Sequence, residues 1–164
     1  MPTSPTEKTP MATQTQDQAI HFRRPGWFTR RVFNPLVGLL IRLGLSVRGS
    51  RVLEHRGRLS GRLHHTPVNL LTVDGRQYLV APRGETDWVR NVRAHGGKLV
   101  LILGRRRQLC TAKELPVPER TAILRAYLRR WKFEVGMFFD GVGPGSTDDE
   151  FAAIAARHPV FVLQ

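Results

Sequence analysis

The sequence predicts one mainly β domain of the α+β class, an antiparallel barrel of about six strands with peripheral helices. Three observations lead to this fold class. The 164 residues, 41% of them hydrophobic and 24% charged, fit a single domain with its own core and exclude a wholly disordered, collagen-like or coiled-coil chain. Short β-branched and apolar runs alternate with tight turns. The long crossovers that a parallel sheet needs are missing from most of the chain.

Six segments have the composition of strands. The run of Thr, Val and Leu after residue 65 ends at Asp74-Gly75, a pair that supplies the positive φ angles of a tight hairpin turn. A basic turn at residues 104–107 connects a later pair, and the apolar run before the last residue would be exposed unless it joined the sheet. The predicted strands are residues 51–55, 66–73, 77–81, 98–103, 108–112 and 159–163.

Three segments after residue 84 have helical patterns. Residues 85–95 are amphipathic and end at a Gly pair. Beyond Pro118, apolar residues recur at helical spacing up to Trp131, with Arg120 and the other arginines of this stretch turned mostly outward. The run Thr147-Asp148-Asp149-Glu150 fits a capping box, so we expect a final helix to about residue 157.

The N-terminal part differs from the barrel. We expect a disordered tail over residues 1–20, a helical segment over 21–49 and the barrel domain over 50–164. Asn34-Pro35 suits the start of a short helix, which either covers one end of the core or makes peripheral contact with a membrane surface. No apolar run reaches the ~20 residues that span a bilayer. The lone Cys110 allows no internal disulfide, which suits the cytoplasm.

The charge is strongly positive and comes mostly from arginine. Lys and Arg together number 26 against 13 acidic residues, giving a formal net charge of +13. An Arg side chain can hold a phosphate or carboxylate with two parallel hydrogen bonds, whereas Lys offers a point charge. We therefore expect an acidic partner.

The most informative stretch is the loop at residues 56–62, Arg56-Gly57-Arg58-Leu59-Ser60-Gly61-Arg62, between two predicted strands. Glycine lets the backbone approach an anion, and neighbouring amide hydrogens can form a concave nest beside the arginines. The loop is not a Walker motif, because no Gly-Lys-Ser/Thr follows. Its composition fits a phosphate cradle, and a solvated basic turn is an equal alternative.

A second group of residues follows the third predicted strand. Ala81-Pro82-Arg83-Gly84 precedes a helix on which Trp88 and Asn91 share one face, where one can stack and the other can hydrogen-bond. The alternative interpretation makes Trp88 a core residue and Asn91 its neighbour.

In their order and spacing these pieces resemble the deazaflavin (F420)-dependent nitroreductase family. The resemblance covers about residues 34–163 and depends on Gly57-Arg58-Leu59-Ser60-Gly61, Thr66-Pro67, Arg83-Gly84, Trp88 and Asn91, together with the hairpin at residues 74–75. It implies a six-stranded split β-barrel related to the flavin-reductase and pyridoxamine-phosphate-oxidase barrels. It also implies hydride transfer from reduced coenzyme F420 to a flat organic acceptor such as a quinone, nitroaromatic or enone.

The resemblance further implies a coenzyme site in residues 50–164. Arg58, Leu59 and Ser60 would hold the phosphate, with Arg62 as a further anion contact. Residues 64–69 would line the coenzyme edge, residues 81–83 would meet the ring and tail, and residues 88–91 would close the site. The implied coenzyme-binding residues are Arg58, Leu59, Ser60, Arg62, His64, Thr66, Pro67, Asn69, Ala81, Pro82, Arg83, Trp88 and Asn91.

The sequence departs from the family pattern at several positions. Many relatives have a basic residue in place of Leu59 and an Arg in place of His64. The substrate-side tyrosines of the family have no clear counterpart in residues 131–139, so no catalytic residue is assigned.

Other interpretations stay open beside an F420-dependent reductase. FMN could replace the deazaflavin, the protein could carry the coenzyme without turnover, or a basic barrel could bind nucleic acid. The nucleic-acid interpretation is disfavoured because Tyr78 is the only aromatic residue in the predicted central strands. His64-His65 does not predict a metal site, since adjacent strand residues face opposite sides. Related barrels pair through sheet faces, so we expect a homodimer.

Overall fold

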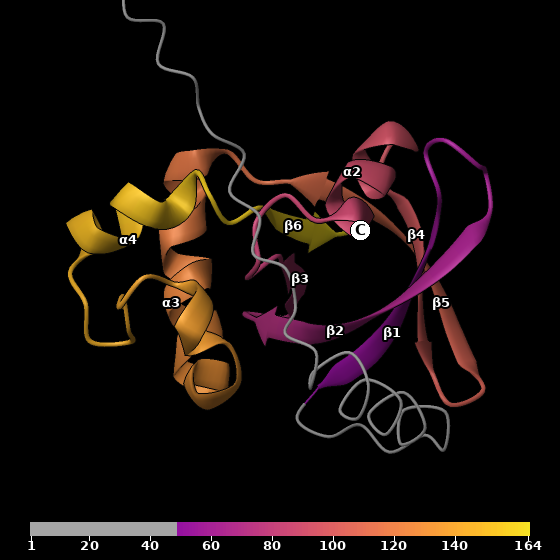
Figure 1. The fold of residues 1–164 in the computed structure, drawn as a ribbon. Coiled ribbons are helices and arrows are strands. Elements are labelled where there is room, and N and C mark those ends of the chain that lie inside the picture. The colour runs from indigo at the N-terminus through magenta and orange to yellow at the C-terminus, as the bar shows by residue number, and fades with distance from the viewer. Residues whose placement is uncertain (1–48) are drawn as a thin grey trace, which may run out of the picture.

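The computed structural model describes residues 49–164, which form a six-stranded antiparallel barrel (Figure 1). The strands follow the order β1-β2-β3-β6-β5-β4 around the closed barrel. The predicted fold class is confirmed. The tail expected at residues 1–20 and the helix expected from Asn34 lie outside the described residues, so the proposed membrane contact does too.

The six strands coincide with the six predicted segments, with shifts at their ends. Most of the difference lies in the second and fifth strands, which are longer than expected because their ends pair with neighbours along the chain. The structure has β1 (Ser50–Arg56), β2 (Leu63–Val73), β3 (Arg76–Val80), β4 (Lys98–Leu103), β5 (Arg106–Glu114) and β6 (Val160–Leu163).

The early start of β2 matters for the site. The strand begins at Leu63, opposite Arg56, and places His64 opposite His55. The loop between β1 and β2 is therefore a short turn that connects the last paired residues of two antiparallel strands. The pairing of these strand ends fixes the position of the loop.

Three non-local pairings close the barrel. β1 pairs with β4 through Leu53 and Leu101, and β6 lies between β3 and β5, with Phe161 opposite both Leu79 and Glu114. The C-terminal strand thus joins the sheet as predicted.

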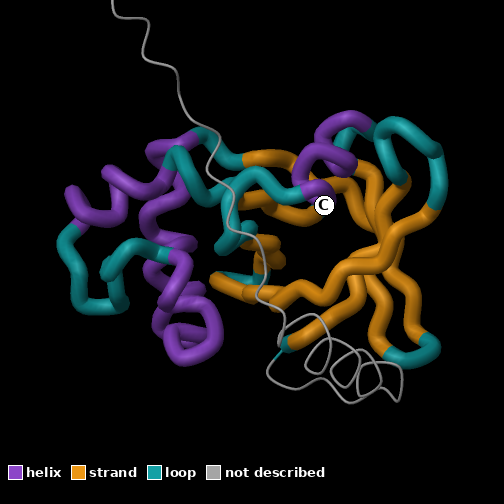
Figure 2. The backbone as a smooth tube through the Cα atoms, viewed as in Figure 1, coloured by secondary structure: helices purple, strands orange, loops and turns teal. Residues whose placement is uncertain are grey.

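Four helical segments complete the described chain: α2 (Asp87–Ala94), α3 (Val117–Val135), the 3-10 turn η2 (Gly136–Phe138) and α4 (Asp148–Ala155). Figure 2 shows α3 and α4 together on one side of the barrel, with α2 packed near the β1–β2 loop. The capping box is present: the Thr147 hydroxyl accepts from the Glu150 backbone N–H, and the Glu150 carboxylate accepts from the Thr147 N–H.

The core consists of two clusters of buried apolar residues, one on each side of the sheet. The first fills the barrel and includes Leu53, Trp88 and Phe161. The second lies between the sheet and α3 with α4, and includes Tyr127 and Trp131. Because α2 contributes Trp88, Val89 and Val92 to the barrel interior, its position is fixed by packing.

The expectation that Arg120 faces outward is wrong. Its side chain is buried, and the guanidinium donates to the Leu115 and Ala155 carbonyls and to the Glu114 carboxylate. A sequence pattern of apolar residues does not reveal such a buried cation, because the neutralising carboxylate of Glu114 comes from β5 and the Ala155 carbonyl comes from α4.

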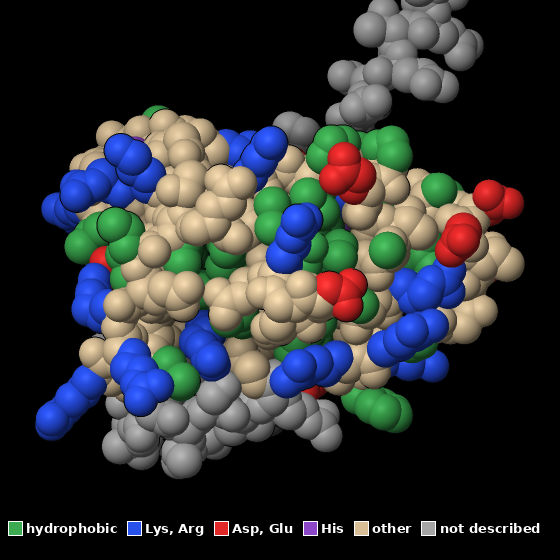
Figure 3. All heavy atoms as spheres, turned by 180° about the vertical axis from the view of Figure 1, so that it is seen from behind, with side chains coloured by type: hydrophobic (Ala, Val, Ile, Leu, Met, Phe, Trp, Pro, Cys, Tyr) green, Lys and Arg blue, Asp and Glu red, His purple; other side chains and the backbone are tan. Residues whose placement is uncertain are grey.

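Residues 49–164 contain no helix with the length and apolarity that crossing a membrane requires. Lys and Arg side chains are spread over the face shown in Figure 3, with few acidic side chains among them.

Candidate functional site

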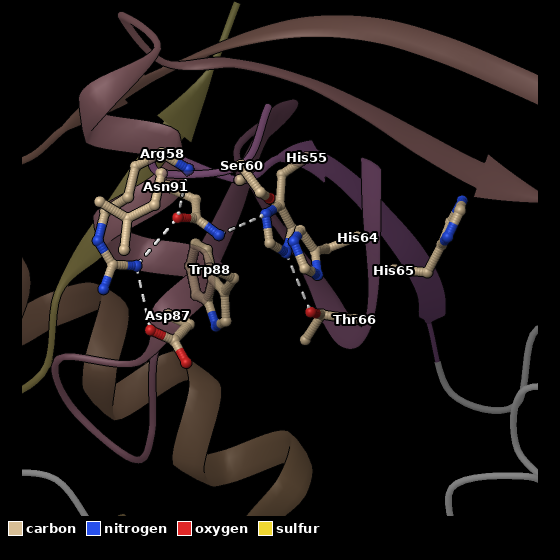
Figure 4. Close-up of a pocket in the computed structure, with 11 residues that line it drawn as sticks. His55, Arg58, Ser60, His64, His65, Thr66, Asp87, Trp88 and Asn91 are labelled. Carbon is tan, nitrogen blue, oxygen red and sulfur yellow. Dashed lines mark hydrogen bonds and ion pairs between the residues drawn. The ribbon is translucent and has the colours of Figure 1, made fainter. Parts of the chain in front are cut away.

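The β1–β2 loop and the first turns of α2 form a pocket of ≈ 420 Å³. Figure 4 shows side chains from three sources converging there: the end of β1, the loop with the start of β2, and α2. The lining residues are His55, Gly57, Arg58, Leu59, Ser60, His64, His65, Thr66, Asp87, Trp88 and Asn91.

The loop that lines the pocket has unpaired backbone donors. The N–H of Gly57 donates to the Arg62 carbonyl at 2.7 Å, and the N–H of Gly61, at φ +67°, donates to the Gly57 carbonyl at 2.9 Å. Within the described part of the chain, the backbone N–H groups of Leu59 and Ser60 have no hydrogen-bond partner. Two consecutive free N–H groups in a tight turn suit an anion.

Gly57 keeps space open at the base of this turn. A Cβ at this position would lie 2.8 Å from Nε2 of His64 and 3.0 Å from Oγ of Ser60, both of which line the pocket. A larger residue would shift one of these side chains, so glycine keeps both in their places in the pocket.

The Arg58 guanidinium is held at the pocket by α2. Its Nη1 donates to Oδ1 of Asn91 at 3.0 Å and to Oδ1 of Asp87 at 3.1 Å. The backbone N–H of Arg58 also donates to Oδ1 of Asn91 at 3.0 Å. Asn91 thus holds both the backbone of the turn and the Arg58 side chain in place.

His55 is buried at the pocket floor, with 4% of its surface exposed. Burial, together with the nearby His64 and His65, lowers the pKa of His55 to about 4, so the imidazole is neutral at neutral pH. Its Nδ1 lies 3.2 Å from Nδ2 of Asn91, and its Nε2 lies 3.2 Å from Oγ1 of Thr66. The ring also stacks on His64 with 5.7 Å between centroids.

The two adjacent histidines of β2 have different partners, as strand alternation predicts. His64 stacks on His55, whereas Nε2 of His65 lies 3.0 Å from Oε2 of Glu54. Burial alone would raise the pKa of Glu54, but hydrogen bonds from Arg107 and His65 outweigh it and lower the pKa. Within residues 49–164 no group of three or more His, Cys, Asp or Glu residues is placed to hold a metal ion.

Trp88 has two roles in the structure. It packs against Phe161 inside the barrel, with 5.5 Å between ring centroids, and it also lines the pocket. Its core interpretation is therefore correct, and one edge still reaches the candidate site.

Seven of the thirteen predicted coenzyme-binding residues line the pocket: Arg58, Leu59, Ser60, His64, Thr66, Trp88 and Asn91. The other six do not line it, and each has another place. Arg62 is exposed at the end of the loop, and Pro67 is exposed on β2 opposite Val52. Oδ1 of Asn69 accepts from the Ser50 hydroxyl.

The three predicted residues before α2 also lie away from the pocket lining. Ala81 is fully buried in the barrel core, and Pro82 is half-buried beside it. The Arg83 guanidinium lies over the Phe138 ring, 4.9 Å from its centroid, and burial lowers its pKa. A site that includes residues 81–83 would need the ligand to extend beyond this pocket.

Sequence reasoning missed His55 and Asp87 as pocket residues. The alternation of side chains along β1 places His55 on the same face as buried Leu53, and this pattern could have indicated that His55 is buried. Asp87 had no such signal, because it depends on where α2 packs.

A second pocket of ≈ 520 Å³ lies beside His55 and includes the exposed side chains of Leu63 and Leu109. Arg56, His95 and Lys98 line it as well, so it combines apolar and basic groups.

Three solved structures share this fold. A chain described as F420-H2 dependent reductase (FDR-A) matches with a TM-score of 0.51 at 18% identity, over 71% of this chain and 95% of that chain. A chain described as a domain-swapped dimer matches with a TM-score of 0.53 at 16% identity, over 80% and 96%. The protein Atu2129 from Agrobacterium tumefaciens, described as of unknown function, matches with a TM-score of 0.52 at 14% identity, over 79% and 53%.

These structural similarities show the fold, and a family model identifies the family. The search of curated proteins gives no match. The model of the F420H(2)-dependent quinone reductases matches residues 27–134, which is more than half of the chain and includes the β1–β2 loop, α2 and most of α3. The resemblance inferred from the loop and from Trp88 and Asn91 is thereby confirmed, and the chain belongs to the F420H(2)-dependent quinone reductase family.

Proposed function

We propose that the protein binds reduced coenzyme F420 in the pocket at the β1–β2 loop and transfers hydride to a flat organic acceptor, such as a quinone, nitroaromatic or enone. The observation that carries the proposal is the pair of unpaired N–H groups at Leu59 and Ser60 beside the Arg58 guanidinium. Family membership supports the choice of coenzyme.

The residues at the loop fit the phosphate of the coenzyme. Its oxygens are acceptors, and the loop offers two backbone donors, the Ser60 hydroxyl and a guanidinium. The Ser60 Oγ accepts from the Arg62 N–H at 3.3 Å, which leaves its hydrogen free to donate. The net charge of +13 adds a long-range attraction for the acidic tail.

The rest of the pocket fits a flat ring. The His64 ring, part of Trp88 and the Thr66 hydroxyl line the pocket. When bound, the coenzyme supplies the hydride, and the protein supplies position and electrostatics. Binding at the remote phosphate orients the ring and replaces a bimolecular encounter with an oriented one.

Tyr78 gives no support to the nucleic-acid alternative. Its ring is buried in the core between the sheet and α3, so β3 presents no stacking surface to a single strand.

The test is the affinity of the Arg58→Ala variant for F420, measured by the change in deazaflavin fluorescence. Loss of charge-assisted hydrogen bonds should weaken binding by about 1–3 kcal/mol, or roughly 5- to 150-fold. Arg129→Ala removes an exposed arginine on α3 and serves as the matched control. Unchanged affinity for Arg58→Ala would reject the site. Retention of FMN instead of F420 would reject the coenzyme.

Turnover separates a reductase from a coenzyme carrier. Oxidation of F420H2 should accelerate when protein and a quinone, nitroaromatic or enone are both present. Tight F420 binding with no acceleration for any of these acceptors would support a carrier instead.

A homodimer is part of the same proposal. Leu109 on β5 and Leu63 at the start of β2 are 80% and 54% exposed and line the second pocket, which suits burial against another copy. One structural neighbour is described as a domain-swapped dimer. Light scattering should give twice the chain mass of 18.6 kDa, and Leu109→Glu should lower it.

A further inference from the structure

A continuous hydrogen-bond chain runs from β2 through β1 and α2 to the β1–β2 loop. Thr66, His55, Asn91 and Arg58 follow one another, with contacts of 3.2, 3.2 and 3.0 Å (Figure 4). His55 and Asn91 are both buried, at 4% and 5% exposure, so water does not compete for these bonds.

The direction of each hydrogen bond follows from the end at Arg58. Oδ1 of Asn91 accepts the backbone N–H and Nη1 of Arg58, so the other end of the amide, facing His55, is the NH2 donor. Nδ1 of His55 must then accept. A neutral imidazole that accepts at Nδ1 carries its hydrogen on Nε2, which donates to the Thr66 hydroxyl.

We infer that His55 is a positioning residue for the anion-binding loop: by accepting at Nδ1 it fixes the orientation of the Asn91 amide, and through it the turn and the guanidinium of Arg58. The role of this loop in holding the coenzyme phosphate rests on the proposed function. His55 also lines the pocket floor, and the effect inferred here reaches the ligand through the Asn91 amide.

Without the acceptor, the Asn91 NH2 group would be buried with no partner, which is costly in an apolar setting. Rotation of the Asn91 amide by 180° would place its NH2 group, which is a donor, against the two N–H donors of Arg58. Either outcome loosens the turn at Leu59 and Ser60, where the two free N–H groups lie.

Two substitutions separate this role from simple packing. His55→Phe keeps an aromatic ring stacked on His64 but removes both nitrogens. His55→Asn removes the ring but keeps an acceptor oxygen the same number of bonds from the backbone as Nδ1. A positioning role predicts that Asn preserves function better than Phe, whereas a packing role predicts the reverse.

The measurement is F420 affinity by fluorescence titration of the full chain. We expect His55→Phe to weaken binding roughly tenfold and His55→Asn to stay within roughly threefold of the wild type. In an Asn91→Ala background His55→Phe should cause no further loss, because the two residues act in one chain. Full affinity of His55→Phe, or losses that multiply in the double variant, would overturn the inference.

A second readout does not depend on the ligand or on a variant that folds. Nitrogen NMR of the wild-type histidine rings should show His55 with its hydrogen on Nε2, and an Nδ1–H form would overturn the inference. If the wild type binds no F420 while His55 has the expected tautomer, the proposed function fails and the positioning geometry stands.

Discussion

The Arg58 guanidinium is paired with the Asp87 carboxylate, with 3.1 Å between Nη1 and Oδ1. The pair joins the β1–β2 loop to the first residue of α2, and the Asp87 side chain is 79% exposed. The Asp87 carboxylate therefore occupies a hydrogen-bonding position of the guanidinium that we propose for the coenzyme phosphate. On the proposed function the two anions compete, and we therefore expect Asp87 to lower the affinity of the loop for its ligand.

Removing this competitor should strengthen binding. Asp87→Asn keeps the size of the side chain and removes its charge, and we expect F420 affinity to rise by up to roughly fivefold, the range for an exposed ion pair. The gain should shrink as salt is added. Fluorescence titration at two ionic strengths measures both effects. As a control, Asp149→Asn makes the same change in the first turn of α4 and should leave F420 affinity unchanged. Weaker F420 binding by Asp87→Asn would show that the carboxylate contributes to ligand binding instead.

The pKa of His55 makes stability depend on pH. The folded-state pKa is about 4, below the usual 6.5, so between these values the unfolded chain binds a proton that the folded chain does not. Stability should therefore fall as pH drops from about 6.5 to 4, by up to about 1.4 kcal/mol per pH unit, with no contribution from His55 above pH 6.5. The charged groups that act on His55 are His64, His65, Asp87 and His95.

Urea unfolding of the wild type and His55→Asn at several pH values isolates this contribution, because the other titrating groups are common to both proteins. The difference between the two free energies of unfolding should change across this window and be flat above it. A constant difference down to pH 4 would contradict the lowered pKa.

The position of α2 depends on a glycine at its end. Gly97 has φ +81°, its carbonyl accepts from the Ala112 N–H, and an added Cβ would overlap the Ala112 carbonyl oxygen. Gly96 has φ +61° and open space around it. Gly97→Ala should therefore lose at least about 2 kcal/mol more stability than Gly96→Ala, which has only backbone strain. Equal losses of stability for the two variants in thermal unfolding would show that β5 can shift to relieve the overlap at Ala112.

Local features of the fold were predictable from the sequence. Asp74-Gly75 adopts φ angles of +48° and +75° and connects β2 to β3 as expected, because this pair has a strong preference for the turn. The capping box at Thr147 is equally local. The placement of β6 between β3 and β5 was not predictable, since pairing across more than 40 residues depends on how the whole sheet closes.

In the candidate site, too, the local features were predictable from the sequence and the long-range contacts were not. The loop composition and the spacing of Trp88 and Asn91 indicated which segments meet, and the structure brings them together. Residues 81–83 were expected in the same site, but the buried turn before α2 directs Arg83 toward Phe138. The link from Asn91 to His55 could not be read from the sequence, because it depends on the contact of α2 with the end of β1.

In the proposed function, the β1–β2 loop binds the phosphate of F420. The most direct test compares the binding of F420 with that of the same deazaflavin chromophore lacking the phosphate and glutamate tail, for the wild type and Arg58→Ala. We expect the wild type to prefer F420 strongly and Arg58→Ala to lose most of this preference. Equal affinity of the wild type for both ligands, or a preference unchanged by Arg58→Ala, would contradict this role of the loop.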